Sequence, residues 1–192
     1  KFTGCAPVRE RVFCVDDAGA FQPAVALDAL RRWSTGTSPI FLFGLTVHFE
    51  QLALCTDQPI ALAAPVRGLT GGGWKGIAKR LGRDEIIARL GALLQAPSLD
   101  IRDLFGLTEH PLHYIGCSHG RFHVPKYARA TILDASGARA AAGEPGLIRL
   151  SSPLFASLPS HDLLTEDRGT WGEHCPCGEP LPYLVYLDRV TA

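Results

Sequence analysis

The sequence predicts an α/β fold, in which a partly parallel sheet with helices in residues 1–109 precedes a β-rich, distorted-barrel-like half in residues 110–192. Two observations support this prediction. Short apolar runs alternate with helix-like segments as far as residue 107, and this alternation is typical of parallel sheets. After Glu109 the apolar runs are short, broken by Gly, Pro and Ser, and lack a helical repeat, which is typical of antiparallel sheets and barrels.

Each element of the first half has its own signal. Residues 24–33 follow Pro23, and proline is favoured in the first turn of a helix. Residues 86–94 carry the clearest helix, because their apolar side chains recur on one helical face. A further helix is expected over residues 49–55. The expected buried strands are residues 39–43, 59–66 and 101–105, with a ragged edge strand near residues 12–15 and a glycine-rich segment at residues 70–75.

The second half is expected to contain only short strands. They are predicted at residues 127–133, 147–150, 162–165 and 183–187.

Composition excludes several classes of function. The chain has 192 residues, of which 46% are hydrophobic and 20% charged, as in ordinary soluble domains. Nineteen basic residues balance nineteen acidic ones, so neither a nucleic acid nor an anionic membrane is expected as a partner. No apolar stretch reaches the ~18 residues of a membrane span, and the N-terminus has no signal-peptide pattern. We therefore expect a cytoplasmic protein.

The cysteines and histidines suggest a metal rather than disulfides. Cys117 and His123 are separated by five residues, while Cys175 and Cys177 are separated by one and followed by Gly178. Three thiolates and one imidazole match a closed tetrahedral zinc site, and a closed site is structural rather than catalytic. The sequence therefore predicts structural Zn²⁺ that joins two distant segments of the β-rich half.

Two alternatives to this zinc site stay open. The cysteines can act as small buried apolar residues, with the histidines solvated. The fourth ligand can also be His113, His119 or His174 instead of His123.

Five motifs occur in an order that resembles one enzyme superfamily. They are GGGWK at residues 71–75, FGLTE at 105–109, GEPG at 143–146, LLTEDRG at 163–169, and Asp188-Arg189. This order resembles the adenylate-forming superfamily, and within it the acyl-protein synthetases of bacterial luciferase operons and their phenylacetate–CoA ligase relatives. Those relatives also carry a Cys…Gly-x-His segment and a Cys-x-Cys-Gly segment. The resemblance covers roughly residues 38–189, which is the C-terminal part of such an enzyme.

The resemblance implies ATP and Mg²⁺ as cofactors. It places Thr108 on the α-phosphate and Glu109 on Mg²⁺, as the residues of the catalytic centre. The residues that it places around the nucleotide are Gly72, Gly73, Trp74, Phe105, Asp167 and Arg189. Asp167 would bind the ribose hydroxyls, and Arg189 the ribose or phosphate. Each has a plainer interpretation: the glycines as a turn, Thr108 and Glu109 as a loop at a strand end, and Asp167 as a turn carboxylate.

The resemblance also implies what the enzyme would do. It would activate a carboxylic acid substrate and pass the acyl group to an acyl-accepting protein or to CoA. Residues 34–38 are polar but lack the Gly-Lys ending of the family's phosphate-binding loop, so they are better interpreted as a connecting loop. The chain has no methionine, so we expect it to begin inside a longer protein. It would then pack against a missing N-terminal half, a second subunit or a second copy. The alternative is a non-catalytic, zinc-stabilised nucleotide-binding, acyl-binding or docking domain.

Overall fold

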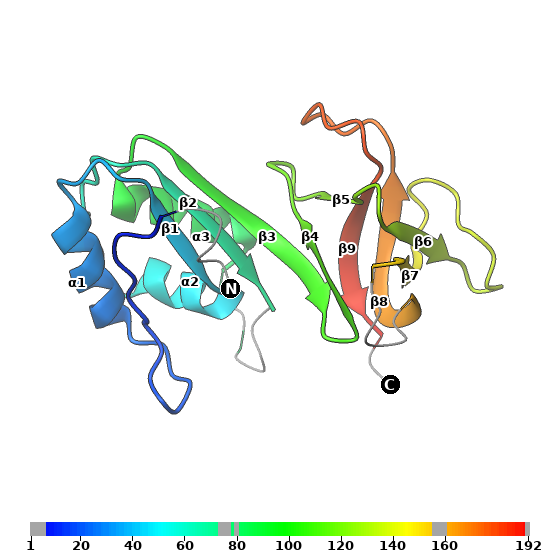
Figure 1. The fold of residues 1–192 in the computed structure, drawn as a ribbon, viewed down its shortest axis with the longest axis horizontal. Helices are drawn as coiled ribbons and strands as arrows, with labels where there is room; N and C mark the ends of the chain where they lie inside the picture. The colour runs from blue at the N-terminus through cyan, green and yellow to red at the C-terminus, as the bar shows by residue number, and fades with distance from the viewer. Residues whose placement is uncertain (1–6, 73–77, 79–80, 155–160, 191–192) are drawn as a thin grey trace. The chain divides into compact units, whose positions relative to one another are not determined.

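The computed structural model of the protein describes residues 7–72, 78, 81–154 and 161–190 (Figure 1). The chain divides into two compact units, residues 1–101 and residues 102–192. Each unit contains its own cluster of buried apolar side chains.

The helices and strands follow in the order α1 (Pro23–Trp33), β1 (Ile40–Leu45), α2 (Thr46–Leu54), β2 (Val66–Gly71), α3 (Arg83–Leu94), β3 (Leu99–Leu107), β4 (His110–Ile115), β5 (Phe122–His123), β6 (Arg129–Leu133), β7 (Gly146–Ser151), β8 (Asp162–Gly172) and β9 (Tyr183–Arg189). They form a four-stranded sheet in the order β1-β2-β3-β4 and a five-stranded sheet in the order β5-β9-β8-β7-β6. The three helices expected in the first half are confirmed. None of the helices in the described residues is long and apolar enough to be a membrane span.

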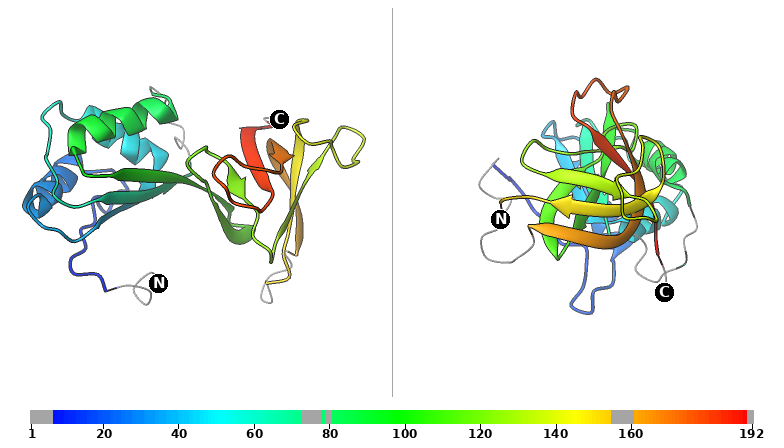
Figure 2. Two further views of the ribbon diagram at one scale, coloured as in Figure 1. Left: turned by 90° about the horizontal axis from the view of Figure 1, so that it is seen from above. Right: turned by 90° about the vertical axis from the view of Figure 1, so that its right-hand side faces the viewer.

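The core of the first unit lies between the helices and one face of its strands. β1 and β2 are parallel, with Ile40 opposite Val66, and both of these side chains are buried. Leu90 and Leu94 of α3 are fully buried in the same cluster. Figure 2 shows α2 and α3 together on one side of these strands.

The prediction of a strand over residues 59–66 is wrong. Residues 59–65 bury alternate side chains, including Ile60 and Leu62, as a strand would. However, the backbone N–H groups of Ile60 and Leu62 donate to the carbonyls of Leu93 and Leu94, at 2.6 and 3.2 Å. These carbonyls end α3 and have no partner within the helix, so the segment caps a helix instead of joining the sheet. The strand begins at Val66 and runs into the glycine-rich segment.

The edge strand expected near residues 12–15 is also not formed. In the described residues this segment has only one bridge, between Val15 and Phe21.

The second unit is β-rich, as predicted, and all the strand pairs of its five-stranded sheet are antiparallel. The strand order is open, with β5 and β6 at opposite edges, so the described strands do not close a barrel. β5 has only two residues, and Pro125, which has no N–H to donate to a neighbouring strand, follows soon after it. The short strands β4 and β5 were not predicted.

Two phenylalanines lie on the face of β1 that points away from the core. Ile40 faces the core, and because strand side chains alternate, Phe41 and Phe43 lie on the opposite face. The Phe41 side chain is 58% exposed. Parallel strands are normally covered on both faces, and the expectation of an uncovered apolar face stays a prediction.

Candidate functional site

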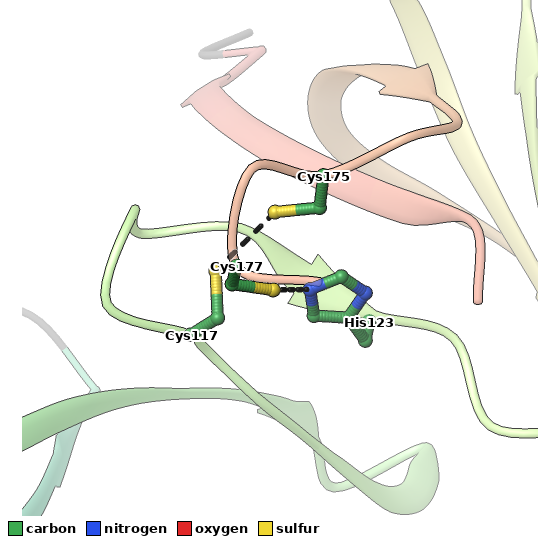
Figure 3. A group of neighbouring side chains, drawn as sticks. All are labelled: Cys117, His123, Cys175 and Cys177. Atoms are coloured by element: carbon green, nitrogen blue, oxygen red, sulfur yellow. Dashed lines mark hydrogen bonds between the residues drawn. The ribbon is translucent and has the colours of Figure 1, made fainter. Parts of the chain in front are cut away.

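Four side chains from two distant segments of the second unit converge on one point. Cys117 follows β4, His123 lies in β5, and Cys175 and Cys177 lie between β8 and β9. Their three sulfurs and one ring nitrogen all lie within 4.8 Å of one another. Figure 3 shows the four side chains pointing toward a common centre. This is the arrangement expected of ligands to a single metal ion.

Two tight turns present the cysteines. In the first, the Gly120 N–H donates to the Cys117 carbonyl at 2.9 Å, and Gly120 has a φ of +67°. In the second, the Gly178 N–H donates to the Cys175 carbonyl at 3.0 Å, and Gly178 has a φ of +86°. Positive φ favours glycine, so each turn needs its glycine to bring the sulfurs together.

The ring of His123 is oriented for coordination. Its Nδ1 lies 3.2 Å from the carbonyl oxygen of Leu181, and a carbonyl can only accept, so Nδ1 carries the proton. Nε2 therefore has a free lone pair, and it lies 3.2 Å from the Cys177 sulfur. Metal-bound histidines usually donate their other ring N–H in this way.

The sulfur spacing fits a metal and excludes a disulfide. The sulfurs of Cys117 and Cys175 are 3.7 Å apart, whereas a disulfide needs about 2.05 Å. A tetrahedral zinc ion with Zn–S distances of about 2.3 Å would place two sulfur ligands about 3.8 Å apart. The imidazole in the cluster is that of His123. The rival ligands His113, His119 and His174 are not in the cluster, although the backbone N–H of His119 donates to the Cys117 sulfur at 3.4 Å.

The pKa of each thiol depends on its neighbours. Burial raises the pKa of the Cys117 thiol, but the backbone N–H groups of Arg121 and His119 lower it, and the net pKa lies below the ordinary value. The Glu179 N–H lowers the pKa of Cys177, but burial and the neighbouring thiols raise it, and here the net pKa lies above the ordinary value. The pKa of Cys175 also lies below the ordinary value, so Cys177 is the thiol of the three that its neighbours keep from ionising. A divalent cation would favour all three thiolates.

A second group of expected residues meets on β8 and β9. Asp167 and Arg189 are paired across the two strands. The Arg189 Nε donates to the Asp167 carboxylate at 3.0 Å, with the Asp167 side chain buried and the Arg189 side chain half exposed. Burial raises the pKa of the nearby Tyr186, and the charge of Asp167 raises it further.

The remaining expected residues with described side chains lie on or next to β3. Thr108 and Glu109 are exposed and form the two-residue turn between β3 and β4. The ring of Phe105 packs among aromatic rings of its own unit, with centroid distances of 6.0 Å to Tyr114, 5.7 Å to Phe122 and 5.9 Å to Tyr186.

The glycine-rich motif is described only in part. Gly72 is exposed after β2, with a φ of +72°, so it adopts the conformation that a glycine turn requires. Gly73 and Trp74 lie outside the described residues.

Tyr186 was not among the expected residues, although its ring lies 5.9 Å from that of Phe105, centroid to centroid. Its place there depends on the register of β8 and β9, which shifts between Arg168 and Gly169. No local motif identified in the sequence specifies that shift.

Comparison with known proteins gives a family and a fold. Residues 26–192 match the family described as "Acyl-protein synthetase, LuxE". No curated protein was found to match the chain. Similar solved structures are amide bond synthetase McbA from Marinactinospora thermotolerans (19% identity, TM-score 0.58), a long-chain-fatty-acid-CoA ligase from Archaeoglobus fulgidus (15%, 0.60) and a luciferase-like enzyme from the mealworm Zophobas morio (15%, 0.62).

These structures show the fold alone, because each is less than 25% identical to the chain. The matches cover 89%, 90% and 89% of this chain, but only 35%, 37% and 42% of the other proteins. The chain therefore spans about two fifths of their length or less.

The geometry of the cluster predicts which histidine binds metal. His123→Ala should weaken metal binding by more than the roughly 10–100-fold typical of losing a ligand's hydrogen-bond partner. His119→Ala keeps the N–H that bonds Cys117, and His174→Asn suits the positive φ at that position, so both should retain the metal. Elemental analysis after dialysis against a weak chelator measures the ratio of metal to protein. Metal loss in either control with retention in His123→Ala would show that the ligand assignment is wrong.

Proposed function

Because the chain belongs to the LuxE family of acyl-protein synthetases, we propose that it is part of an ATP-dependent enzyme that activates a carboxylic acid. In the first step a carboxylate oxygen attacks the α-phosphorus of ATP, forming an acyl-adenylate and releasing pyrophosphate. In the second step a thiol sulfur attacks the acyl carbon, forming a thioester and releasing AMP. The thiol is that of a protein cysteine or of CoA.

The observation that carries this proposal is the pairing of Asp167 with Arg189. A carboxylate that faces a nucleotide can accept hydrogen bonds from two ribose hydroxyls, since ionised carboxylates have about four acceptor positions. Arg189 donates to one oxygen of this carboxylate and so fixes its direction. The guanidinium, being half exposed, retains donors for a phosphate or ribose oxygen.

The turn between β3 and β4 supplies the proposed catalytic groups. Thr108 would donate to the α-phosphate, and Glu109 would hold Mg²⁺, which prefers carboxylate oxygens. Both side chains are exposed at the tip of a hairpin, so the chain itself leaves them accessible to a ligand. Mg²⁺ would neutralise the charge that develops on the phosphate oxygens.

The metal proposed for the Cys/His cluster is zinc in a structural role. Three thiolates and one imidazole occupy all four tetrahedral positions, so no position is left for water or substrate. The cluster would therefore stabilise the second unit rather than take part in the reaction.

The second candidate function is that of a zinc-stabilised binding domain that catalyses no reaction. The packing of Phe105 among aromatic rings of its own unit favours this function. Phe105 is one of the residues assigned to the nucleotide, and here its ring already has other contacts. Carboxylate-dependent exchange of labelled pyrophosphate into ATP distinguishes the two, because only an adenylating enzyme catalyses it.

The ribose assignment predicts the effect of Asp167→Ala in the enzyme that contains this chain. Loss of hydrogen bonds to a charged group should raise the KM for ATP by about tenfold or more. Asp28→Ala, which removes an exposed carboxylate of α1, is the matched control and should leave the exchange rate unchanged. Circular dichroism of both variants checks that they fold. An unchanged KM in a folded Asp167→Ala variant would rule out the ribose role.

The face of β1 that carries Phe41 is proposed to pack against the polypeptide that supplies the rest of such an enzyme. The similar ligases are more than twice as long as the matched region, and exposed apolar side chains on a sheet favour contact with a partner. Phe41, which is 58% exposed, is the residue expected to make this contact.

This packing predicts a difference in apolar dye binding. The 192-residue chain should bind anilinonaphthalene sulfonate more strongly than the longer protein does, and Phe41→Ser should reduce the signal. Phe13→Ser, at a side chain that is 79% exposed and outside the sheet, is the matched control. If the chain forms a dimer that Phe41→Ser dissociates, the face is instead assigned to a second copy.

A further inference from the structure

The second unit contains a cavity that neither the metal cluster nor the proposed nucleotide residues use. Its volume is about 650 Å³, and it is lined by residues of β6 and by the segments at residues 124–128 and 181–184. Thr108, Glu109, Asp167 and Arg189 do not line it, and neither do the four Cys/His residues. The volume lies within the 300–1,000 Å³ typical of small-molecule sites.

The lining is strongly basic although the chain is neutral. Four cationic side chains line the cavity (Lys126, Arg129, Arg139 and Arg149), against one carboxylate, that of Glu173. A concentration of positive charge around a hollow raises the local concentration of anions.

Two of these cations already have partners. The Arg149 guanidinium pairs with the Asp162 carboxylate. The Arg139 guanidinium lies over the Trp171 ring, 4.2 Å from its centroid. Lys126 and Arg129 are exposed, and neither forms an ion pair with a described residue. The cavity therefore has two cations to offer a ligand.

Part of the lining is apolar, and two of its contacts are hydrogen bonds. Val124, Leu181 and Leu184 line it beside Trp171. The Val124 N–H donates to the Pro182 carbonyl at 2.8 Å, which joins two of the lining segments. The Trp171 indole N–H donates to the Ala140 carbonyl at 2.9 Å. A site held in this way loses little conformational freedom when a ligand binds.

From this combination we propose that the cavity binds a small organic phosphate monoester. A phosphate monoester carries nearly two negative charges at pH 7, which matches the two cations without partners. The guanidinium of Arg129 can bond two phosphate oxygens, and Lys126 acts as a point charge. The apolar walls accommodate the organic part of the ligand. A monoanionic carboxylate or sulfate would satisfy only one of the two cations.

Phenyl phosphate is a suitable probe, because it lacks the adenine and ribose that the nucleotide residues would recognise. Its binding to the full chain is measured by isothermal titration calorimetry at low and at physiological salt, with phenyl sulfate as the singly charged control. Phenyl phosphate should bind about tenfold more tightly than phenyl sulfate, and the difference should shrink as salt is added.

Substitutions then locate the site. Lys126→Gln with Arg129→Gln should weaken phenyl phosphate binding by about tenfold for each cation removed. Arg9→Gln with Arg11→Gln removes the same charge from exposed positions in the first unit and should leave the affinity unchanged. In NMR spectra the indole N–H signal of Trp171, identified by its loss in Trp171→Phe, should shift on titration.

Three results would overturn the proposal: equal affinity for the two probes, equal weakening in the two double variants, or no shift at Trp171. The NMR spectra of the double variants also show that they are folded.

Discussion

The Cys/His cluster joins two loops of the second unit, one between β4 and β5 and the other between β8 and β9. β5 pairs with β9 through Phe122 and His123, and the Val124 N–H adds one hydrogen bond to the Pro182 carbonyl. The ladder at this edge of the sheet is therefore short. The Cys/His cluster adds four ligand atoms across a sequence separation of 58 residues between Cys117 and Cys175. Metal binding would close this long loop and contribute its free energy to folding. The edge of the sheet is thus expected to form together with the metal site.

β9 links this site to the proposed nucleotide residues. Its first residue, Tyr183, pairs with His123, and its last, Arg189, pairs with Asp167. A shift of β9 by one residue would turn alternate side chains to the other face of the sheet and separate Arg189 from the carboxylate. A bound metal at one end of the strand would therefore position the proposed nucleotide pair at the other end. The metal we propose would thus act through register, although it has no open coordination position.

The sequence was most informative where a function requires particular residue types at short spacing. Cys-Pro-Cys-Gly and Cys117 with His123 identified the cluster, because thiolates and imidazole at such spacings are typical of a metal site. The sequence was less informative where partners decide the structure. Residues 59–65 have the alternating burial of a strand, but their N–H groups bond the end of α3. Likewise the β8–β9 register and the cavity around Arg129 depend on residues far apart in the chain, which no local pattern specifies.

We propose that three thiolates and one imidazole hold a zinc ion that fixes this register. Zinc K-edge X-ray absorption of protein purified without added metal measures the ligand shell of such an ion. We expect about three sulfur neighbours near 2.3 Å and one nitrogen neighbour near 2.0–2.1 Å. A shell of only oxygen and nitrogen neighbours, or a folded protein without zinc, would rule out this site.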